Sequence, residues 1–428
     1  MKIKYVSLIN FKESLGKKKI ILFGTTYMAK EAVSRFSSEI KDKIAGAVDN
    51  DQNRWGEKFC AENICVDIYG PEYLKTQNFD EIALLIVSKS YGEIRYQLDH
   101  MEELDDLHCY IYPWLLKYAD EKELYKKRIL DPYLLRIERK EDPVYQKIVG
   151  KTAKGEAPLL IPGLNVIISN YCNLACKECS ALMPYFSKKE YIVSNEIIED
   201  LERLFDCIDA CATVDVIGGE PLLHPELDKI IEFLIEQKKL NQIRIVSNGT
   251  VLIKEEWLKI FSHPKVKMVI SDYGYIVKMA ALVKQLEVNK INFDIMSNMR
   301  WIKTGRPEYM GKSEEDLEGE YYVCDNGLNC KTIMSGKFFG CGRSARLWAL
   351  RKYNSENDYR DLGDKEELNR EAVWDILNLK RMDACNYCNI AREEEYVQPG
   401  KQIDNKEMQS KYTIIEREEY EKLLRGTV

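Results

Sequence analysis

The cysteines of this sequence have a number and spacing that suit metal binding. The chain holds 13 cysteines among 428 residues, and residues 1–19 do not have the pattern of a signal peptide. An odd number of cysteines in a long chain without a secretion signal argues against a disulfide framework and favours metal ligation or redox chemistry. Eight of them form two groups: Cys172, Cys176 and Cys179, and then Cys324, Cys330, Cys341, Cys385 and Cys388.

The first group has the spacing C-x3-C-x2-C, with no fourth cysteine nearby. Three thiolates on a [4Fe–4S] cluster leave one iron open for a further ligand. An open coordination position is what separates a catalytic metal site from a structural one. The alternative is a structural zinc with a remote fourth ligand, although the chain has only four histidines.

Apolar runs that alternate with helical stretches surround this group and predict a parallel sheet. In such sheets, functional residues gather at the carboxyl ends of the strands. The first cysteine group follows the first of these runs. The predicted strands are residues 165–169, 214–218, 242–248, 266–272 and 292–298.

Short motifs of glycine and polar residues follow the next three predicted strands. Glycine permits close approach of the backbone to a ligand, and a carboxylate can accept hydrogen bonds from an ammonium group. The three motifs are Gly218-Gly219-Glu220-Pro221, Ser247-Asn248-Gly249-Thr250 and Ser271-Asp272-Tyr273-Gly274.

The cysteine triple and the three motifs, in this order, resemble the radical S-adenosylmethionine (SAM) superfamily over residues 160–300. The resemblance implies a partial (β/α)6 barrel over residues 161–315. It also implies reductive cleavage of SAM to a 5′-deoxyadenosyl radical, which abstracts a hydrogen atom from the substrate. One departure is Glu178, which stands where the family usually has an aromatic residue near the adenine. By resemblance, the cluster ligands are Cys172, Cys176 and Cys179, and the SAM contacts are Gly218, Gly219, Glu220, Pro221, Ser247, Asn248, Ser271 and Asp272.

The second group includes the pattern C-x11-G-x4-C, followed by a CxxC pair at residues 385–388. Residues 331–341 predict a tight hairpin with Ser335-Gly336 at its turn. This pattern resembles the Twitch domain, the short form of SPASM, which implies a small hairpin and helix module at residues 316–400 with one auxiliary [4Fe–4S] cluster. A structural zinc is the alternative. The resemblance favours Cys324, Cys341, Cys385 and Cys388 as ligands, while Cys330 either replaces one of them or remains a free thiol.

Residues 1–115 predict a doubly wound α/β domain. Gly24 keeps only the first glycine of a G-x-G-x-x-G motif, and Asp49 and Asp51 stand where a ribose-binding acid would lie. The stretch resembles the Rossmann-like domain of sugar-modifying acyltransferases of the surface-glycan type, which implies nucleotide-sugar binding, with a structural role as the alternative. We expect a helical linker at 116–160 and a terminal helix at 401–428.

The net charge of −7 argues against nucleic acid as the main partner. No apolar run reaches the roughly 18 residues of a membrane span, so we expect a cytoplasmic enzyme. Arg343 and Arg346 could bind a substrate phosphate, with solvated surface arginines as the alternative.

The family resemblance implies oxidation of a secondary alcohol on a carbohydrate or nucleotide sugar. The auxiliary cluster would accept an electron, and flavodoxin or ferredoxin would supply the reductant. The alternatives are a sugar epimerase in which the catalytic Cys330 thiol returns a hydrogen atom, a peptide-modifying (RiPP-type) maturase, and a non-enzymatic electron carrier.

Overall fold

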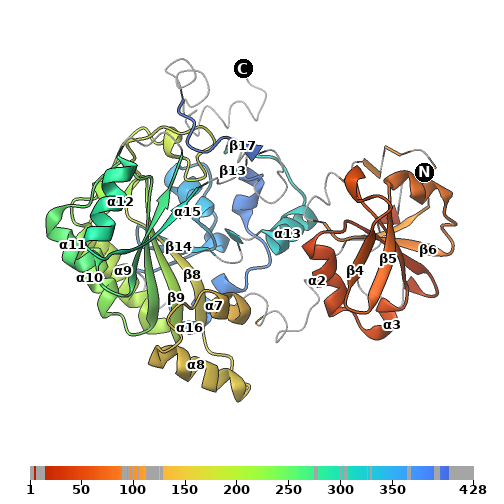
Figure 1. The fold of residues 1–428 in the computed structure, drawn as a ribbon, viewed down its shortest axis with the longest axis horizontal. Helices are drawn as coiled ribbons and strands as arrows, with labels where there is room; N and C mark the ends of the chain where they lie inside the picture. Colours follow the sequence, from red (N-terminus) through yellow and green to blue (C-terminus); the bar gives the residue numbers. More distant parts are fainter. Residues whose placement is uncertain are drawn as a thin grey trace. The chain divides into compact units, whose positions relative to one another are not determined.

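A computed structural model of the chain shows two compact units (Figure 1). The first unit comprises Met1–Ala119, Ser313–Val323 and Ala391–Glu394, and the second comprises the rest of the chain. The structure describes residues 4–5, 15–88, 94, 97–98, 100–101, 103–104, 106–111, 125, 129–273, 278–297, 301–302, 307–324, 326–327, 330–363, 368–389 and 396–403.

The first unit is built on a seven-stranded sheet in the order β1-β7-β6-β2-β3-β5-β4. All neighbouring strands are parallel except β4 and β5, which form a hairpin. The strands are β1 (Lys4–Tyr5), β2 (Lys19–Phe23), β3 (Ile44–Val48), β4 (Lys58–Ala61), β5 (Ile64–Tyr69), β6 (Ile82–Ile86) and β7 (His108–Ile111). The helices include α2 (Tyr27–Arg35), α3 (Ser38–Lys41) and α13 (Glu314–Val323). The predicted α/β class is therefore confirmed here.

This unit contains one disulfide that the sequence analysis did not predict. Cys60 and Cys65, which stand outside both cysteine groups, are bonded to each other. They are direct partners in the register of β4 and β5. The hairpin turn brings them together, so a single local disulfide exists although no disulfide framework was expected.

The second unit is built on an eight-stranded sheet in the order β12-β11-β10-β9-β8-β14-β15-β16. The six strands from β12 to β14 in this order run parallel, which confirms a parallel α/β arrangement. The strands are β8 (Leu160–Ile167), β9 (Ala210–Ile217), β10 (Leu240–Ser247), β11 (Val266–Ser271), β12 (Asn292–Met296), β14 (Lys331–Met334), β15 (Lys337–Phe339) and β16 (Tyr359–Asp361).

Four helices that follow these strands pack on the sheet (Figure 1). They are α9 (Ser194–Cys207), α10 (Leu227–Glu236), α11 (Leu258–Phe261) and α12 (Met279–Val288). In α10, the buried residues Leu227, Ile230, Ile231 and Leu234 recur at helical spacing and face the core. The other helices of this unit are α7 (Asp131–Leu135), α8 (Pro143–Ala153), α15 (Gly342–Ala349) and α16 (Arg370–Leu377).

The predicted hairpin is present as β14 and β15, which pair antiparallel. Ser335 and Gly336 form its turn, and both have positive φ angles, 48° and 76°. Two residues with positive φ are the signature of a type I′ turn. The hairpin also pairs with β8 through β14, so the region of the predicted Twitch-like module shares one sheet with the predicted barrel.

Two expected segments are described only in part. Residues 116–124 and 126–128 of the predicted linker, and residues 404–428 of the predicted terminal helix, lie outside the described residues. Among the residues that the structure describes, no helix is long and apolar enough to cross a membrane.

Candidate functional site

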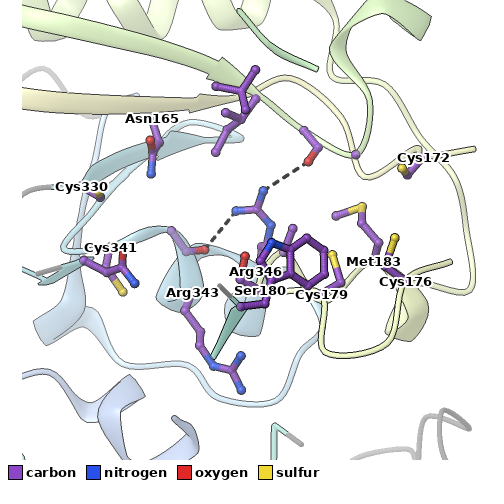
Figure 2. A pocket seen from close by; sticks show the side chains of 18 of the residues that line it. Asn165, Cys172, Cys176, Cys179, Ser180, Met183, Cys330, Cys341, Arg343 and Arg346 are labelled. Carbon is purple, nitrogen blue, oxygen red and sulfur yellow. Dashed lines mark hydrogen bonds between the residues drawn. The ribbon is translucent and has the colours of Figure 1, made fainter. Parts of the chain in front are cut away.

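A cavity of about 350 Å³ lies at the carboxyl ends of β8 to β11. Cysteines of both groups line it, together with residues of the motifs that follow β9, β10 and β11. Figure 2 shows the first cysteine group on one side of this cavity and Cys330 and Cys341 on the other. The sheet therefore brings into one site residues that lie more than a hundred positions apart in the sequence.

The first cysteine group lies on the loop after β8, and all three of its cysteines line the cavity. Burial, with a smaller contribution from the nearby Cys179, raises the pKa of the Cys172 thiol to about 11 and that of the Cys176 thiol to about 12. The sulfur of Cys172 accepts hydrogen bonds from Leu174 N (3.4 Å) and Asn248 Nδ2 (3.6 Å). Thiols with raised pKa values need a nearby cation to become thiolates, and iron would supply it.

The Gly-Gly motif after β9 contacts the cysteine loop through its backbone. Gly218 and Gly219 both line the cavity. A Cβ atom on Gly219 would lie 2.1 Å from Tyr171 O and 2.5 Å from Cys172 N. Glu220 N also donates a hydrogen bond to Tyr171 O at 2.8 Å. Glycine is needed here because the two chain segments approach more closely than a side chain allows.

The Glu220 side chain faces the protein backbone instead of the cavity. It is fully buried, and its carboxylate accepts hydrogen bonds from Asn248 N (2.7 Å), Ser247 Oγ (2.9 Å) and Leu222 N (3.1 Å). Burial raises the pKa of Glu220 to about 7, against the lowering effect of these bonds. The carboxylate thus ties the end of β9 to the end of β10. Glu220 and Pro221, both expected to contact SAM, are not among the residues that line the cavity.

The motifs after β10 and β11 contribute to the cavity in part. Ser247, Asn248 and Ser271 line it, whereas Asp272 does not. Asp272 accepts a hydrogen bond from Ser297 Oγ at 3.3 Å instead. Tyr273 also lines the cavity and packs edge-on against Trp301, with ring centroids 5.6 Å apart. Gly274 lies outside the described residues.

The four cysteines of the second group that the resemblance favours as ligands also line the cavity: Cys324, Cys341, Cys385 and Cys388. Burial, with smaller contributions from the nearby Cys388 and Cys341, raises the pKa of Cys324 to about 12. Cys388 likewise raises the pKa of Cys341, after the larger effect of burial. The sulfurs of Cys324, Cys341 and Cys388 therefore lie near one another.

Backbone contacts position two of these cysteines. Cys341 begins α15, where its sulfur accepts a hydrogen bond from Ser344 N at 3.4 Å. The buried carboxylate of Asp358 accepts from Asp383 N (2.9 Å) and Ala384 N (2.8 Å), just before Cys385. The hairpin and this turn thus hold distant segments at one side of the cavity.

Cys330 lies apart from the other cysteines of its group. It lines the same cavity, but the charged groups near its sulfur are Arg136, Asp215 and Arg244. Burial has the largest effect and raises the pKa of the Cys330 thiol. The structure thus brings Cys324, and not Cys330, to Cys341 and Cys388.

A row of polar residues crosses the sheet beside Cys330. In the strand register, Thr332 is opposite Asn165, Asn165 is opposite Asp215, and Asp215 is opposite Arg244. Arg244 donates two hydrogen bonds to Asp215, from Nε at 2.6 Å and from Nη2 at 2.5 Å. The sequence analysis missed this row, although charged residues inside the apolar runs VDVIG and QIRIV were a usable signal.

Arg346 lies between the two cysteine groups (Figure 2). Its Nη2 donates to Gly218 O and its Nη1 to Gly342 O, both at 3.3 Å. Its Nε has no hydrogen-bond partner among the described residues. Burial lowers the pKa of Arg346 to about 10, while Cys179 and Cys341 oppose this effect. A buried cation needs nearby negative charge, so this site fits anionic iron-bound thiolates on both sides. Arg343 and Arg346 are both buried, so they are not the solvated surface arginines considered above.

In the first unit, the two acids expected to bind a ribose, Asp49 and Asp51, form hydrogen bonds within the protein. Asp49 Oδ2 accepts hydrogen bonds from the backbone N (2.9 Å) and the hydroxyl of Thr25. Asp49 also pairs with Arg54 at 3.6 Å. Asp51 accepts from Asn53 N at 3.1 Å and begins the turn Gln52–Arg54. Both acids stabilise local structure at the ends of β2 and β3.

Known proteins are similar to part of the chain. Residues 166–270 match the family model of the radical SAM superfamily. A GTP 3′,8-cyclase of Clostridium acetobutylicum is 33% identical over 94 residues, which cover 21% of this chain and 28% of the cyclase. An S-adenosylmethionine-dependent nucleotide dehydratase of Fibrobacter sp. is 28% identical over 178 residues, 39% of this chain and 45% of the dehydratase. The chain thus matches less than half the length of either relative.

Solved structures have lower sequence identity to this chain. BtrN in complex with AdoMet and 2-DOIA has a TM-score of 0.38 and 15% identity, covering 57% of this chain and 98% of BtrN. Native anSMEcpe with bound AdoMet has a TM-score of 0.35 and 16% identity, covering 54% of this chain and 83% of anSMEcpe. Residues 166–270 are therefore a radical SAM domain, and the cofactors of that superfamily are SAM and a [4Fe–4S] cluster.

Proposed function

We propose that this enzyme oxidises a secondary alcohol of a carbohydrate or nucleotide-linked sugar, with an auxiliary [4Fe–4S] cluster as electron acceptor. One observation carries the proposal: both cysteine groups line a single cavity of about 350 Å³. A substrate in this cavity would lie between the site of radical formation and the site that accepts an electron.

Residues of the chain would hold the cofactors as follows. Cys172, Cys176 and Cys179 would bind the catalytic cluster, and Cys324, Cys341, Cys385 and Cys388 would bind the auxiliary one. Gly218, Gly219, Ser247, Asn248 and Ser271 line the cavity and would contact SAM. Glu220 would act indirectly, because its carboxylate holds Ser247 and Asn248 in place.

The bound cofactors would supply a 5′-deoxyadenosyl radical. In the proposed reaction, the alcohol carbon loses a hydrogen atom to this radical, the hydroxyl group loses a proton to water, and one electron leaves for the auxiliary cluster. The product is a ketone. Arg346 would stabilise negative charge that develops on the oxygen, because its guanidinium is fixed at the cavity between the cysteine groups.

Two features support a nucleotide-linked sugar as the substrate. The relatives reported above are named for the cyclisation of GTP and for the dehydration of a nucleotide. Arg343 also lines the cavity, and a guanidinium group suits phosphate recognition.

Cys330 favours a second candidate, sugar epimerisation. Its thiol lines the cavity away from the first cysteine group (Figure 2), where it could return a hydrogen atom to the opposite face of a substrate radical. Burial raises its pKa, so the sulfur keeps its hydrogen at neutral pH. The resulting thiyl radical would be restored by one electron and one proton from the external reductant.

The test is anaerobic incubation of the reconstituted enzyme with SAM, dithionite and a panel of nucleotide sugars. Substrate-dependent 5′-deoxyadenosine and a ketone product would support oxidation. Solvent deuterium in an unoxidised product, lost in Cys330→Ser, would support epimerisation instead. If no sugar supports 5′-deoxyadenosine formation but a precursor peptide does, both oxidation and epimerisation of a sugar are overturned.

A further inference from the structure

A segment near the C-terminus lies along the loop that carries the first cysteine group. We call residues 396–403 the strap. Its strand β17 (Tyr396–Val397) pairs antiparallel with β13 (Trp301–Ile302). Further along, Lys177 N donates to Lys401 O at 2.7 Å, and Ile403 N donates to Ala175 O at 2.8 Å. The backbone of the strap is therefore bonded on both sides of Cys176.

The side chain of Gln402 completes this contact. Its Oε1 accepts a hydrogen bond from Ala175 N at 2.8 Å. Its Nε2 donates to the sulfur of Cys176 at 3.1 Å and to Gly400 O at 2.7 Å. These three bonds fix the orientation of the amide group, so that an N–H group points at the sulfur.

The position of the strap is also fixed from the cavity side. A Cβ atom on Gly400 would lie 2.5 Å from Cγ of Tyr273, and Gly400 has a φ of +69°. Tyr273 lines the cavity and packs against Trp301 of β13. The strap therefore contacts the cysteine loop and a wall of the cavity together.

We infer that Gln402 is a positioning residue for the catalytic cluster and tunes its reduction potential through the N–H···S bond to Cys176. Hydrogen bonds to cluster sulfurs are one of the factors that set such potentials. Reduction adds negative charge to the cluster and its thiolates, and an N–H donor stabilises the more negative state. Gln402 therefore makes the cluster easier to reduce, which is the step that precedes SAM cleavage. The inference rests on Cys172, Cys176 and Cys179 as the cluster ligands, and it does not depend on the substrate.

Two substitutions separate the bond to sulfur from the bond to the loop. Gln402→Glu keeps an oxygen acceptor for Ala175 N but removes the N–H donor and adds a negative charge. Gln402→Met removes both bonds at similar volume. Lys401→Gln is the control for charge, because it also makes the chain more negative by one unit, while the contact of residue 401 with Lys177 uses only backbone atoms. Lys401 is exposed.

The measurement is redox titration of each reconstituted full-length enzyme, followed by electron paramagnetic resonance, with iron content determined in parallel. The catalytic cluster is identified as the signal that changes when SAM is added. We expect its midpoint potential to become more negative in Gln402→Met and more negative still in Gln402→Glu, with a smaller shift in Lys401→Gln.

Two results would overturn the inference. One is an unchanged midpoint potential in Gln402→Glu and Gln402→Met with iron content like that of the wild type. The other is a shift in Lys401→Gln as large as that in Gln402→Glu, which would mean that charge alone matters. Gln402→Met could lose the iron of the cluster whose signal changes with SAM. In that case Gln402→Glu is decisive: a more negative midpoint potential supports the inference, and an unchanged potential rejects it.

Discussion

Arg346 donates a hydrogen bond from Nη2 to the carbonyl oxygen of Gly218, at 3.3 Å. Gly218 begins the motif after β9, whereas Arg346 belongs to α15, which starts beside Cys341. The same guanidinium bonds to Gly342 O. One buried side chain thus joins the motif beside the first cysteine group to the helix that follows Cys341 of the second group.

Replacement of Arg346 should weaken the function of both cysteine groups. Removal of one partner from a buried charge pair costs about 3–5 kcal/mol, of which part is recovered by relaxation. We expect Arg346→Gln to slow 5′-deoxyadenosine formation by about 10- to 100-fold, since each 1.4 kcal/mol is a factor of ten. Arg346→Lys should lose less, because it keeps the charge. Arg351→Gln, at an exposed position after α15, serves as the control, and an unaffected Arg346→Gln enzyme would contradict the prediction.

Gly219→Ala should displace the cysteine loop. The new methyl group would lie 2.1 Å from Tyr171 O, and backbone atoms cannot move away as a flexible side chain can. We expect about four iron ions per chain to be lost, the content of one cluster. Gly150→Ala is the matched control, because no atom lies within 4 Å of its added Cβ. Iron analysis of both reconstituted variants checks this, and full iron content in Gly219→Ala would reject it.

Cys324 and Cys330 should behave differently on substitution. Cys324 lies near Cys341 and Cys388, whereas Cys330 lies near Arg136, Asp215 and Arg244. We expect Cys324→Ala to lose about four iron ions and the auxiliary-cluster signal, while Cys330→Ala keeps both. Iron content and electron paramagnetic resonance spectra of the two variants provide the measurement. The reverse pattern would show that Cys330 is the ligand.

The stability of the protein should depend on pH through Asp200, whose carboxylate lies beside the hairpin turn. Its buried carboxylate accepts a hydrogen bond from Gly336 N at 2.8 Å, and burial raises the pKa of Asp200 from 3.8 to about 6. The folded state therefore binds this proton more tightly than the unfolded state. The resulting stabilisation is complete below pH 3.8 and is lost as the pH rises through about 6.

Asp200→Asn removes this titration and keeps an oxygen acceptor for Gly336. Relative to the wild type, we expect the variant to gain roughly 1 kcal/mol between pH 5 and pH 8. The difference in thermal midpoint between the two proteins, followed across this range, measures the effect. Asp206→Asn, an exposed position on α9, should show no such trend. A constant difference for Asp200→Asn would contradict the prediction.

The sequence predicted the elements of the second unit well because they depend on local patterns. The five predicted strands correspond to β8 to β12, and Ser335-Gly336 forms the turn of a hairpin as predicted. Motif order alone also indicated which strand ends would meet, since parallel strands place their carboxyl ends at one edge.

What each side chain faces was decided only by tertiary packing. Glu220 follows the expected motif, yet its carboxylate satisfies backbone N–H groups that would otherwise be buried without partners. Asp49 is likewise bonded to Thr25 instead of facing a ligand. A motif fixes where a residue lies along the chain, but the donors around it determine the direction of its side chain.

The sequence by itself identified a radical SAM domain, through three closely spaced cysteines, a Gly-Gly motif and two further strand-end motifs. Only the tertiary structure separated Cys324 from Cys330, placed Arg346 between the two cysteine groups and brought Gln402 to Cys176. The physical reason is distance along the chain. Gln402 and Cys176 are 226 positions apart, and such contacts arise from the packing of whole elements, which local spacing does not specify.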